Sequence, residues 1–356
     1  WWLTGIEYPD WQLIIDGTRN KSWLVYPQVS QSREIFDGSL SVEHARSISG
    51  VDAIVSQDEA QAILRDLSKK HTVVYALGDQ PHAEHLDFVL NPAIKIVREH
   101  VSRLFATVQD CRKELSQLRA IKQTEEITAM RSAIATTIDG FEIVKSKLAN
   151  YHFEYEIEAE FNYHFRTHGA DGHAYDPIVA GGANACTLHY IANRDKLKKR
   201  QMVLLDIGAR RGGYAADITR TYAYGEPTKR QSAVHAAVQS AQREIINLIK
   251  PALSVEQYQK DVDRIMTESL LSLGLMKNVD DTENYYKYFP HAISHGLGVD
   301  VHDSLGSPKY LQPGMVLTVE PGIYIPEEGI GVRIEDDILV TASGSENLSR
   351  RLSTDL

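Results

Sequence analysis

The stretch that decides the fold is MVLLDIGARRGGYAADITRTY (202–222), where two apolar runs flank a glycine-rich turn. This pattern predicts a β-hairpin, because such turns join antiparallel strands. With Arg211 and Gly212 as its loop, Asp206 would lie directly opposite Asp217. Like charges in a direct cross-strand pair are destabilising, and unpaired carboxylates are costly in apolar strands. A bound cation would remove that cost.

A second hairpin is predicted in VLTVEPGIYIPEEGIGVRIEDDILV (316–340). With residues 327–328 as its loop, Glu320 lies opposite Glu335. Pro321 cannot donate a hydrogen bond to the ladder and favours a bulge there, but the two glutamates stay close even after a slip of register. The chain therefore contains two hairpins that each bring two carboxylates together.

Three histidines lie close together in FPHAISHGLGVDVHD (289–303), at His291, His295 and His302. A lone histidine is more often a core or surface group than a ligand, but three in one glycine-containing segment indicate a site. The spacing of His291 and His295 matches the helical zinc-binding motif of metalloproteases. Ala292 occupies the glutamate position of that motif and the glycines argue against a helix, so we exclude it.

The four hairpin carboxylates predict a metal site. Arg220 and Arg333 could not neutralise them all as salt bridges, so a pair of divalent metal ions is the simplest explanation. Carboxylate-rich ligation with a single imidazole suits manganese (Mn²⁺) best, with Co²⁺, Fe²⁺ or Zn²⁺ as alternative occupants. Two such ions would lower the pKa of a water molecule bound between them.

Composition and charge exclude several classes of protein. Hydrophobic residues make up 43% of the 356 residues and charged residues 24%, which excludes a largely disordered chain. The net charge of -10 argues against binding to nucleic acid or an anionic membrane, and no apolar run is long enough to span a bilayer. Cys111 and Cys186 form neither a disulfide framework nor a zinc motif, so we expect a cytoplasmic protein.

The length of the chain predicts two domains. Short apolar runs alternate with helical stretches in the first, which we assign to residues 1–118 as an α/β domain. Its predicted strands and helix cover residues 13–16, 22–26, 71–77 and 58–69. Residues 119–356 form the second domain, in which long amphipathic helices alternate with strand pairs. The opening at Trp1 reads like the middle of a strand and turn, so we expect further residues before it.

With these motifs the sequence resembles the pita-bread metallopeptidases, in their aminopeptidase P and prolidase branch. The resemblance runs from YPD (8–10) through LRAIKQTEEITAMRSA (118–133) to the C-terminal hairpin, and so covers essentially the whole chain. It implies an α/β (α+β) fold. A creatinase-like N-terminal α/β domain would be followed by a pita-bread catalytic domain with a curved, mainly antiparallel sheet covered by helices.

The resemblance also implies five metal ligands and a set of residues that line the substrate site. The ligands match LLDIG, AADITRT, SHGLGVDVHD, TVEPG and VRIEDD, and are Asp206, Asp217, His295, Glu320 and Glu335. The substrate site would be lined by His189 of TLHY, His291, His302 and Arg333, with Tyr175 of AYDPIV as a weaker candidate. In the implied mechanism, the hydroxide held by the metals attacks the scissile carbonyl, with Glu320 as the general base. His189 or His302, beside a metal, would stabilise the oxyanion.

The implied activity is that of a Xaa-Pro aminopeptidase, which removes the first residue of a peptide whose second residue is proline. A homodimer or homotetramer is expected by analogy. An Xaa-Pro dipeptidase (prolidase) is the alternative: Ser294 and ENLS (346–349) favour the aminopeptidase, whereas the short PEEG loop (326–329) departs from it. A catalytically silent binding module of the same fold would have altered ligands. A methionine aminopeptidase fits the large N-terminal domain poorly.

Overall fold

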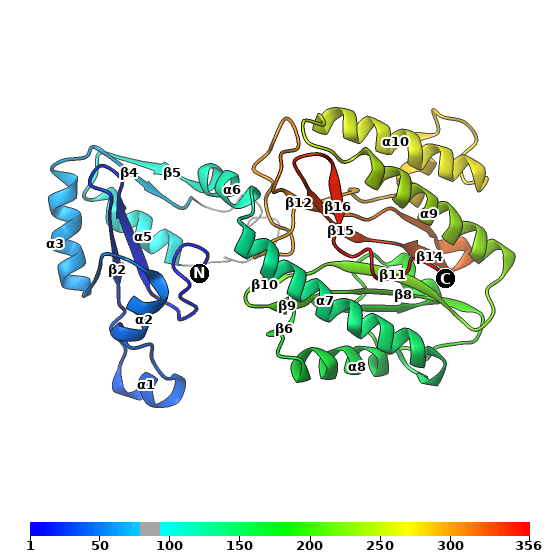
Figure 1. The fold of residues 1–356 in the computed structure, drawn as a ribbon, viewed down its shortest axis with the longest axis horizontal. Coiled ribbons are helices and arrows are strands. Elements are labelled where there is room, and N and C mark those ends of the chain that lie inside the picture. The colour runs from blue at the N-terminus through cyan, green and yellow to red at the C-terminus, as the bar shows by residue number, and fades with distance from the viewer. Residues whose placement is uncertain (79–92) are drawn as a thin grey trace. The chain divides into compact units, whose positions relative to one another are not determined.

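The computed structural model describes residues 1–78 and 93–356, and these fall into two compact units, Trp1–Glu114 and Leu115–Leu356 (Figure 1). The sequence-based boundary after residue 118 lies inside the helix α6 (Arg112–Ala120), which begins in the first unit and ends in the second. Both units mix helices with sheets, which confirms the fold class expected from the sequence.

The first unit is built from small sheets with helices between their strands. β1 pairs antiparallel with β2, β2 pairs parallel with β3, and β4 pairs parallel with β5. The strands are β1 (Gln12–Asp16), β2 (Lys21–Val25), β3 (Ala53–Val55), β4 (Val73–Ala76) and β5 (Thr107–Asp110). The described helices are α1 (Gln31–Asp37), α2 (Val42–Ser49), α3 (Gln57–Ser68) and α5 (Ala93–Ser102). The strands and the helix predicted in this half are therefore confirmed, with small shifts at their ends.

The second unit contains the long helices expected from the sequence. α9 begins with a reciprocal cap, in which Thr228 Oγ1 accepts from Gln231 N and Gln231 Oε1 accepts from Thr228 N. These bonds satisfy N–H groups that have no partner inside the helix, so they fix where it starts. The helices are α7 (Thr124–Lys147), α8 (Glu154–Thr167), α9 (Lys229–Leu248), α10 (Val255–Ser272) and α11 (Thr282–Tyr288), with 3-10 turns η1 (Leu148–Asn150), η2 (Gly182–Cys186) and η3 (Pro326–Glu328). None of the described helices is both long and apolar enough to cross a membrane.

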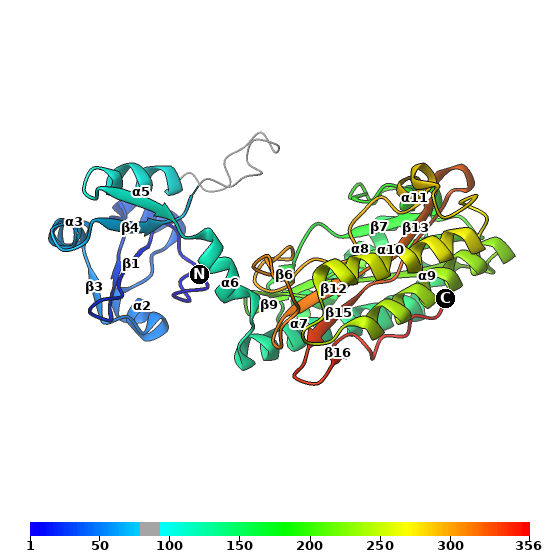
Figure 2. The same ribbon diagram turned by 90° about the horizontal axis from the view of Figure 1, so that it is seen from above.

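The strands of the second unit pair antiparallel, in the orders β10-β9-β6, β11-β8-β7, β12-β15-β16 and β13-β14. They are β6 (Gly172–His173), β7 (Ile178–Gly181), β8 (Gln201–Ile207), β9 (Ala209–Arg211), β10 (Tyr214–Ala215), β11 (Ile218–Tyr224), β12 (Val316–Val319), β13 (Gly322–Ile325), β14 (Ile330–Arg333), β15 (Asp336–Val340) and β16 (Ser345–Asn347). Figure 1 shows these strands between α7 and α8 on one side and α9 and α10 on the other, and Figure 2 shows α9 and α10 running side by side.

Alternation along the strands explains which side chains reach the space between the sheets. Val203 and Leu205 of β8 pack into the core under α7 and α8, so Asp206, the next residue, points to the opposite face. Val332 of β14 packs into the separate core under α9 and α10, and Arg333 consequently faces the other way. Each hairpin therefore turns one face to a helix pair and the other to its neighbour.

Candidate metal centre

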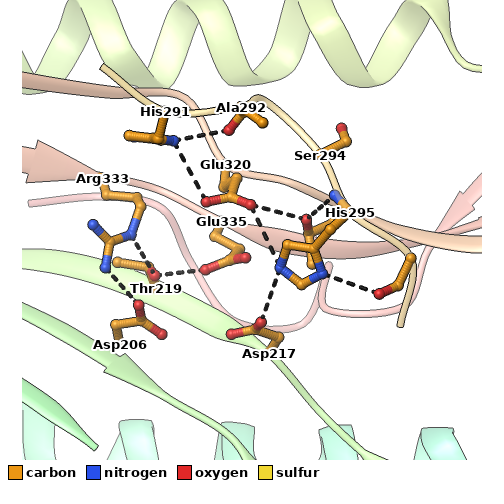
Figure 3. A network of polar contacts seen from close by, with 12 residues as sticks. Asp206, Asp217, Thr219, His291, Ala292, Ser294, His295, Glu320, Arg333 and Glu335 are labelled. Carbon is orange, nitrogen blue, oxygen red and sulfur yellow. Dashed lines mark hydrogen bonds and ion pairs between the residues drawn. The ribbon is translucent and has the colours of Figure 1, made fainter. Parts of the chain in front are cut away.

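The two carboxylate-bearing hairpins lie side by side. Glu335 N donates to Thr219 O at 3.0 Å, and Arg333 N donates to Thr221 Oγ1 at 3.2 Å. These bonds join β11 of the first hairpin to β14 and the residues that follow it. The four carboxylates that face the shared space are Asp206, Asp217, Glu320 and Glu335 (Figure 3).

The register of the first hairpin differs from the prediction. Thr219, and not Asp217, pairs with Asp206, and the loop is Gly212–Gly213 instead of Arg211–Gly212. Both loop glycines have positive φ, 56° and 77°, as a tight hairpin loop of this kind requires. The direct pairing of the two aspartates was therefore wrong. Because the register moves by two residues, Asp217 still shares a face with Asp206.

The two aspartates are joined through Tyr175. Its hydroxyl lies 2.6 Å from Asp206 Oδ1 and 2.6 Å from Asp217 Oδ1, so the two carboxylates share its one donor hydrogen. Gly208 makes room for this contact, because a Cβ at that position would lie 1.7 Å from Ala216 O and 2.9 Å from Tyr175 Cε1. The motif LLDIG thus supplies both a carboxylate and the space beside it.

The second hairpin has the predicted register. The pairs in β12–β15 and in β13–β14 set Glu320 opposite Glu335, at the break between β12 and β13. Pro321 lies at that break, where its carbonyl accepts from Ile334 N at 3.3 Å. Across the two hairpins, Thr219 Oγ1 donates to Glu335 Oε2 at 2.6 Å.

His295 completes the group of candidate ligands. Its segment runs beside β12 and forms no helix, since Thr318 N donates to His295 O at 2.9 Å and His295 N donates to Thr318 Oγ1 at 3.1 Å. His295 Nε2 lies 3.4 Å from Asp217 Oδ2 and 3.5 Å from Glu320 Oε1 (Figure 3). Asp217, His295 and Glu335 offer ligand atoms within 4.8 Å of one another, a spacing that one metal ion could bridge.

Burial and mutual repulsion disfavour the charged forms of these carboxylates. Burial raises the pKa of Glu335 well above its usual range, and the charges of Asp217 and Glu320 raise it further. Burial also raises the pKa of Glu320 to about 7, against the positive charges of His295 and Arg333. For His295, burial opposes protonation, but the hydrogen bond to Asp217 and the charges of Asp217 and Glu320 together outweigh it, and the pKa rises to about 9. A divalent cation would offset the repulsion, so the donor set fits a metal.

Arg333 connects the two hairpins from behind the carboxylates. Its Nη2 donates to Asp206 Oδ2 at 2.5 Å, its Nη1 to Tyr324 Oη at 2.8 Å and its Nε to Thr219 Oγ1 at 3.2 Å. His291 Nε2 lies 2.9 Å from the same Tyr324 hydroxyl. The guanidinium therefore orients one candidate ligand and, through Tyr324, one of the candidate substrate-site histidines.

The three candidate substrate-site histidines come from two segments, His291 and His302 from residues 289–303 and His189 from the loop after η2. His291 Nδ1 lies 3.7 Å from Glu320 Oε2, and burial lowers the pKa of His291 to about 4. His302 is exposed, and its ring lies edge-on to that of His295 with centroids 4.3 Å apart. His189 is exposed in the loop after η2.

Sequence reasoning missed Thr219, Tyr324 and Asp337 at this site. Thr219 lies two residues after Asp217 and Tyr324 four residues after Glu320, so the period of a strand places them on the ligand face and could have found them. Asp337 is buried, and its Oδ2 accepts from Asp217 N at 3.3 Å. Its Oδ1 has no partner among the described residues, and burial raises its pKa well above the usual range.

Comparison with known proteins gives matches along nearly the whole chain. Residues 128–342 match the family model of metallopeptidase family M24, and residues 1–75 match that of the aminopeptidase P N-terminal domain. The chain is 35% identical to the Xaa-Pro aminopeptidase of Escherichia coli (strain K12), over 98% of this chain and 84% of that protein.

Solved structures agree with the sequence matches. The low-pH form of aminopeptidase P from E. coli superposes with a TM-score of 0.85 at 34% identity, covering 100% of this chain and 86% of that one. A zinc-substituted E. coli aminopeptidase P in complex with product gives a TM-score of 0.83 at 32% identity, with the same coverage.

Proposed function

The chain belongs to metallopeptidase family M24, in its aminopeptidase P branch, and we propose on this premise that it is a metal-dependent Xaa-Pro aminopeptidase. Such an enzyme hydrolyses the bond after the first residue of a peptide whose second residue is proline. The observation that carries the proposal is the gathering of Asp217, His295 and Glu335, with Glu320 beside them, in one space between two hairpins. The preference for proline rests on the activity named for the relatives.

We infer that the site holds two divalent ions, with Mn²⁺ the best suited to carboxylates and a single imidazole. When bound, such ions would lower the pKa of a water molecule and polarise the scissile carbonyl. Arg333 would keep Asp206 in the orientation that ligation needs. The residues that would hold the ions are Asp206, Asp217, His295, Glu320 and Glu335.

In this proposal Glu320 is the general base that takes the proton of the attacking water. Its carboxylate lies between His291 and His295, and its side chain keeps 15% of its surface exposed, so a substrate-side proton can reach it. His189, His291 and His302 line the substrate side. As hydrogen-bond donors there they would stabilise the negative charge that develops on the carbonyl oxygen.

The test is release of the first residue from an Xaa-Pro dipeptide and an Xaa-Pro-Xaa tripeptide by metal-free protein given Mn²⁺. We expect turnover of the tripeptide, because the E. coli relative at 35% identity is an Xaa-Pro aminopeptidase. Glu320→Gln should lower kcat by at least about 100-fold, the usual contribution of a general base. Glu327→Gln, in the loop of the same hairpin, is the matched control, since Glu327 pairs with Lys287 at the surface.

The outcomes separate the readings. Turnover of the dipeptide alone would make the protein an Xaa-Pro dipeptidase. No turnover together with no bound metal would exclude an enzyme of this class. Equal losses in Glu320→Gln and Glu327→Gln would exclude Glu320 as the general base.

A cytoplasmic location and a homodimeric or homotetrameric assembly complete the proposal. The two cysteines, Cys111 and Cys186, are free thiols in the structure, which suits a reducing compartment. Light scattering on the purified protein would report the assembly, and a monomeric mass would contradict it.

A further inference from the structure

Glu154, at the start of α8, is a buried carboxylate outside the set of candidate ligands. Its side chain is fully buried, and within the described part of the chain it accepts hydrogen bonds in place of forming an ion pair. Oε1 accepts from Gly181 N at 2.8 Å and Asn184 Nδ2 at 3.0 Å, and Oε2 accepts from Tyr190 Oη at 2.8 Å and Asp195 N at 2.9 Å. Both oxygens are thus saturated by neutral donors.

All four donors belong to one segment, the 181–195 loop, and two of them are its ends. Gly181 N and Asp195 N bind the same carboxylate, and Glu154 N donates back to Asp195 O at 3.0 Å. One residue of α8 therefore closes the loop. One helical turn later, Glu158 Oε2 accepts from Asn193 Nδ2 at 2.9 Å and holds the returning strand of the same loop.

The opposite side of the 181–195 loop rests on the hairpin that carries Arg333. A Cβ at Gly331 would lie 2.3 Å from Ala185 O, so the loop backbone touches β14 directly. Cys186 Sγ also donates to Ile330 O at 3.4 Å. The loop is consequently held between α8 on one side and β14 on the other.

The 181–195 loop carries His189, which the proposed function assigns to the substrate side of the metal centre. His189 is exposed, and its side chain forms no hydrogen bond with the described residues. Its position therefore depends on the path of the loop backbone. That path is set by the contacts of Glu154 and of β14.

We propose that Glu154 is a positioning residue for substrate binding: by closing the 181–195 loop it holds His189 against the substrate, without contacting substrate or metal itself. This inference rests on the proposed peptidase function. A loop closed at both ends by one saturated carboxylate has few alternative conformations, so His189 is held in place before the peptide arrives.

The test compares Glu154→Gln with the wild type on the tripeptide substrate. Glutamine keeps the shape but replaces one acceptor oxygen by an amide that would face two donors. We expect KM to rise by about tenfold or more, with a smaller change in kcat, unchanged Mn²⁺ content and faster amide exchange in residues 182–192. Glu160→Gln is the matched control, because Glu160 lies on the same helix but binds Lys147 and Tyr151. Glu160→Gln should leave KM and the amide exchange of residues 182–192 unchanged.

Two further variants keep the inference testable. Tyr190→Phe removes only one of the four donors to Glu154 and should raise KM by about threefold. It tests the inference even if Glu154→Gln does not fold. Adding His189→Ala to Glu154→Gln should raise KM no further than His189→Ala alone, because the two act through one contact. An unchanged KM in folded Glu154→Gln, loss of metal in that variant, or fully additive effects would overturn the inference.

Failure of the proposed function can be told apart from failure of this inference, because in that case the wild type with Mn²⁺ would cleave neither peptide. In that case the exchange measurement alone decides the role of Glu154 in closing the loop. Faster exchange in Glu154→Gln but not in Glu160→Gln would support that role, and equal rates would overturn it.

Discussion

At the scale of single residues, the hydroxyl of Tyr175 orients the carboxylates of the two aspartates of the first hairpin relative to each other. One hydroxyl serves Asp206 and Asp217 at 2.6 Å each. Burial raises the pKa of Tyr175 well above its usual range, and the nearby carboxylates raise it further, so it stays a donor. Groups that orient metal ligands in this way are nearly as important to affinity as the ligands themselves.

We therefore expect Tyr175→Phe to bind Mn²⁺ about 10- to 100-fold more weakly, the usual loss for a residue that orients ligands. Calorimetric titration of metal-free protein measures this. Tyr163→Phe is the control, because Tyr163 lies on α8 and is 70% exposed. Equal affinities of Tyr175→Phe and the wild type would show that the hydroxyl does not orient the aspartates.

The residue types of the site could be predicted from sequence better than their contacts. The four candidate carboxylate ligands were found because opposed carboxylates in apolar strands call for a cation, and the family resemblance added His295. Tyr324 was missed although it lies on the face of Glu320, because a tyrosine in a strand is ordinary core. The contact of Tyr175 with both aspartates depends on the space at Gly208, which no spacing in the sequence expresses.

At the scale of elements, the first hairpin depends on close backbone contact at Gly208, where β8 ends and β9 begins. A Cβ at Gly208 would lie 1.7 Å from a backbone atom, the carbonyl oxygen of Ala216, which cannot move aside as a side chain can. Gly212, in the loop of the same hairpin, has φ +56° but nothing within 4 Å of a Cβ. One glycine is required by space and the other by backbone conformation.

The two glycines should therefore respond differently to alanine. Gly208→Ala should lower the free energy of unfolding by roughly 3 kcal/mol or more, because the strands must separate. Gly212→Ala should cost only about 1–2 kcal/mol, the strain of a left-handed residue. Urea denaturation of both variants, followed by far-UV circular dichroism, measures the difference. Equal losses of unfolding free energy would mean that the backbone at Gly208 relaxes without parting the strands.

The two hairpins show what sequence can and cannot fix about register. In the second, the loop centred on residues 327–328 was predicted correctly, and Glu320 opposite Glu335 followed from it. In the first, RRGGY offers two adjacent loops. A loop that needs positive φ at both central residues selects Gly212–Gly213, and that requirement was present in the sequence. The error of two residues kept the aspartates on one face, so the site survived it.

At the scale of the whole molecule, the two units have separate cores, and the metal centre belongs to only one of them. The candidate ligands all lie in Leu115–Leu356, whereas the chain's four tryptophans, Trp1, Trp2, Trp11 and Trp23, all lie in Trp1–Glu114. The length and the change in pattern near residue 118 predicted two domains. The charged, helical composition of residues 111–126 predicted a helix at the boundary, and α6 is continuous across the division.

This separation gives the metal a selective effect on stability. A ligand that binds only the folded state stabilises that state by about 4 kcal/mol when its free concentration is 1,000 times its Kd. For a unit of this size, that raises the midpoint of thermal unfolding by roughly 10 °C. Far-UV circular dichroism is dominated by α7 to α10. We therefore expect chelation to lower the midpoint of the thermal transition that it reports, and to leave the midpoint of the tryptophan fluorescence transition unchanged. Glu335→Gln should abolish the shift, because it removes a buried candidate ligand. If chelation lowers the midpoint of the fluorescence transition as much as that of the circular dichroism transition, the two units unfold together. If neither midpoint changes, the site binds no metal under these conditions.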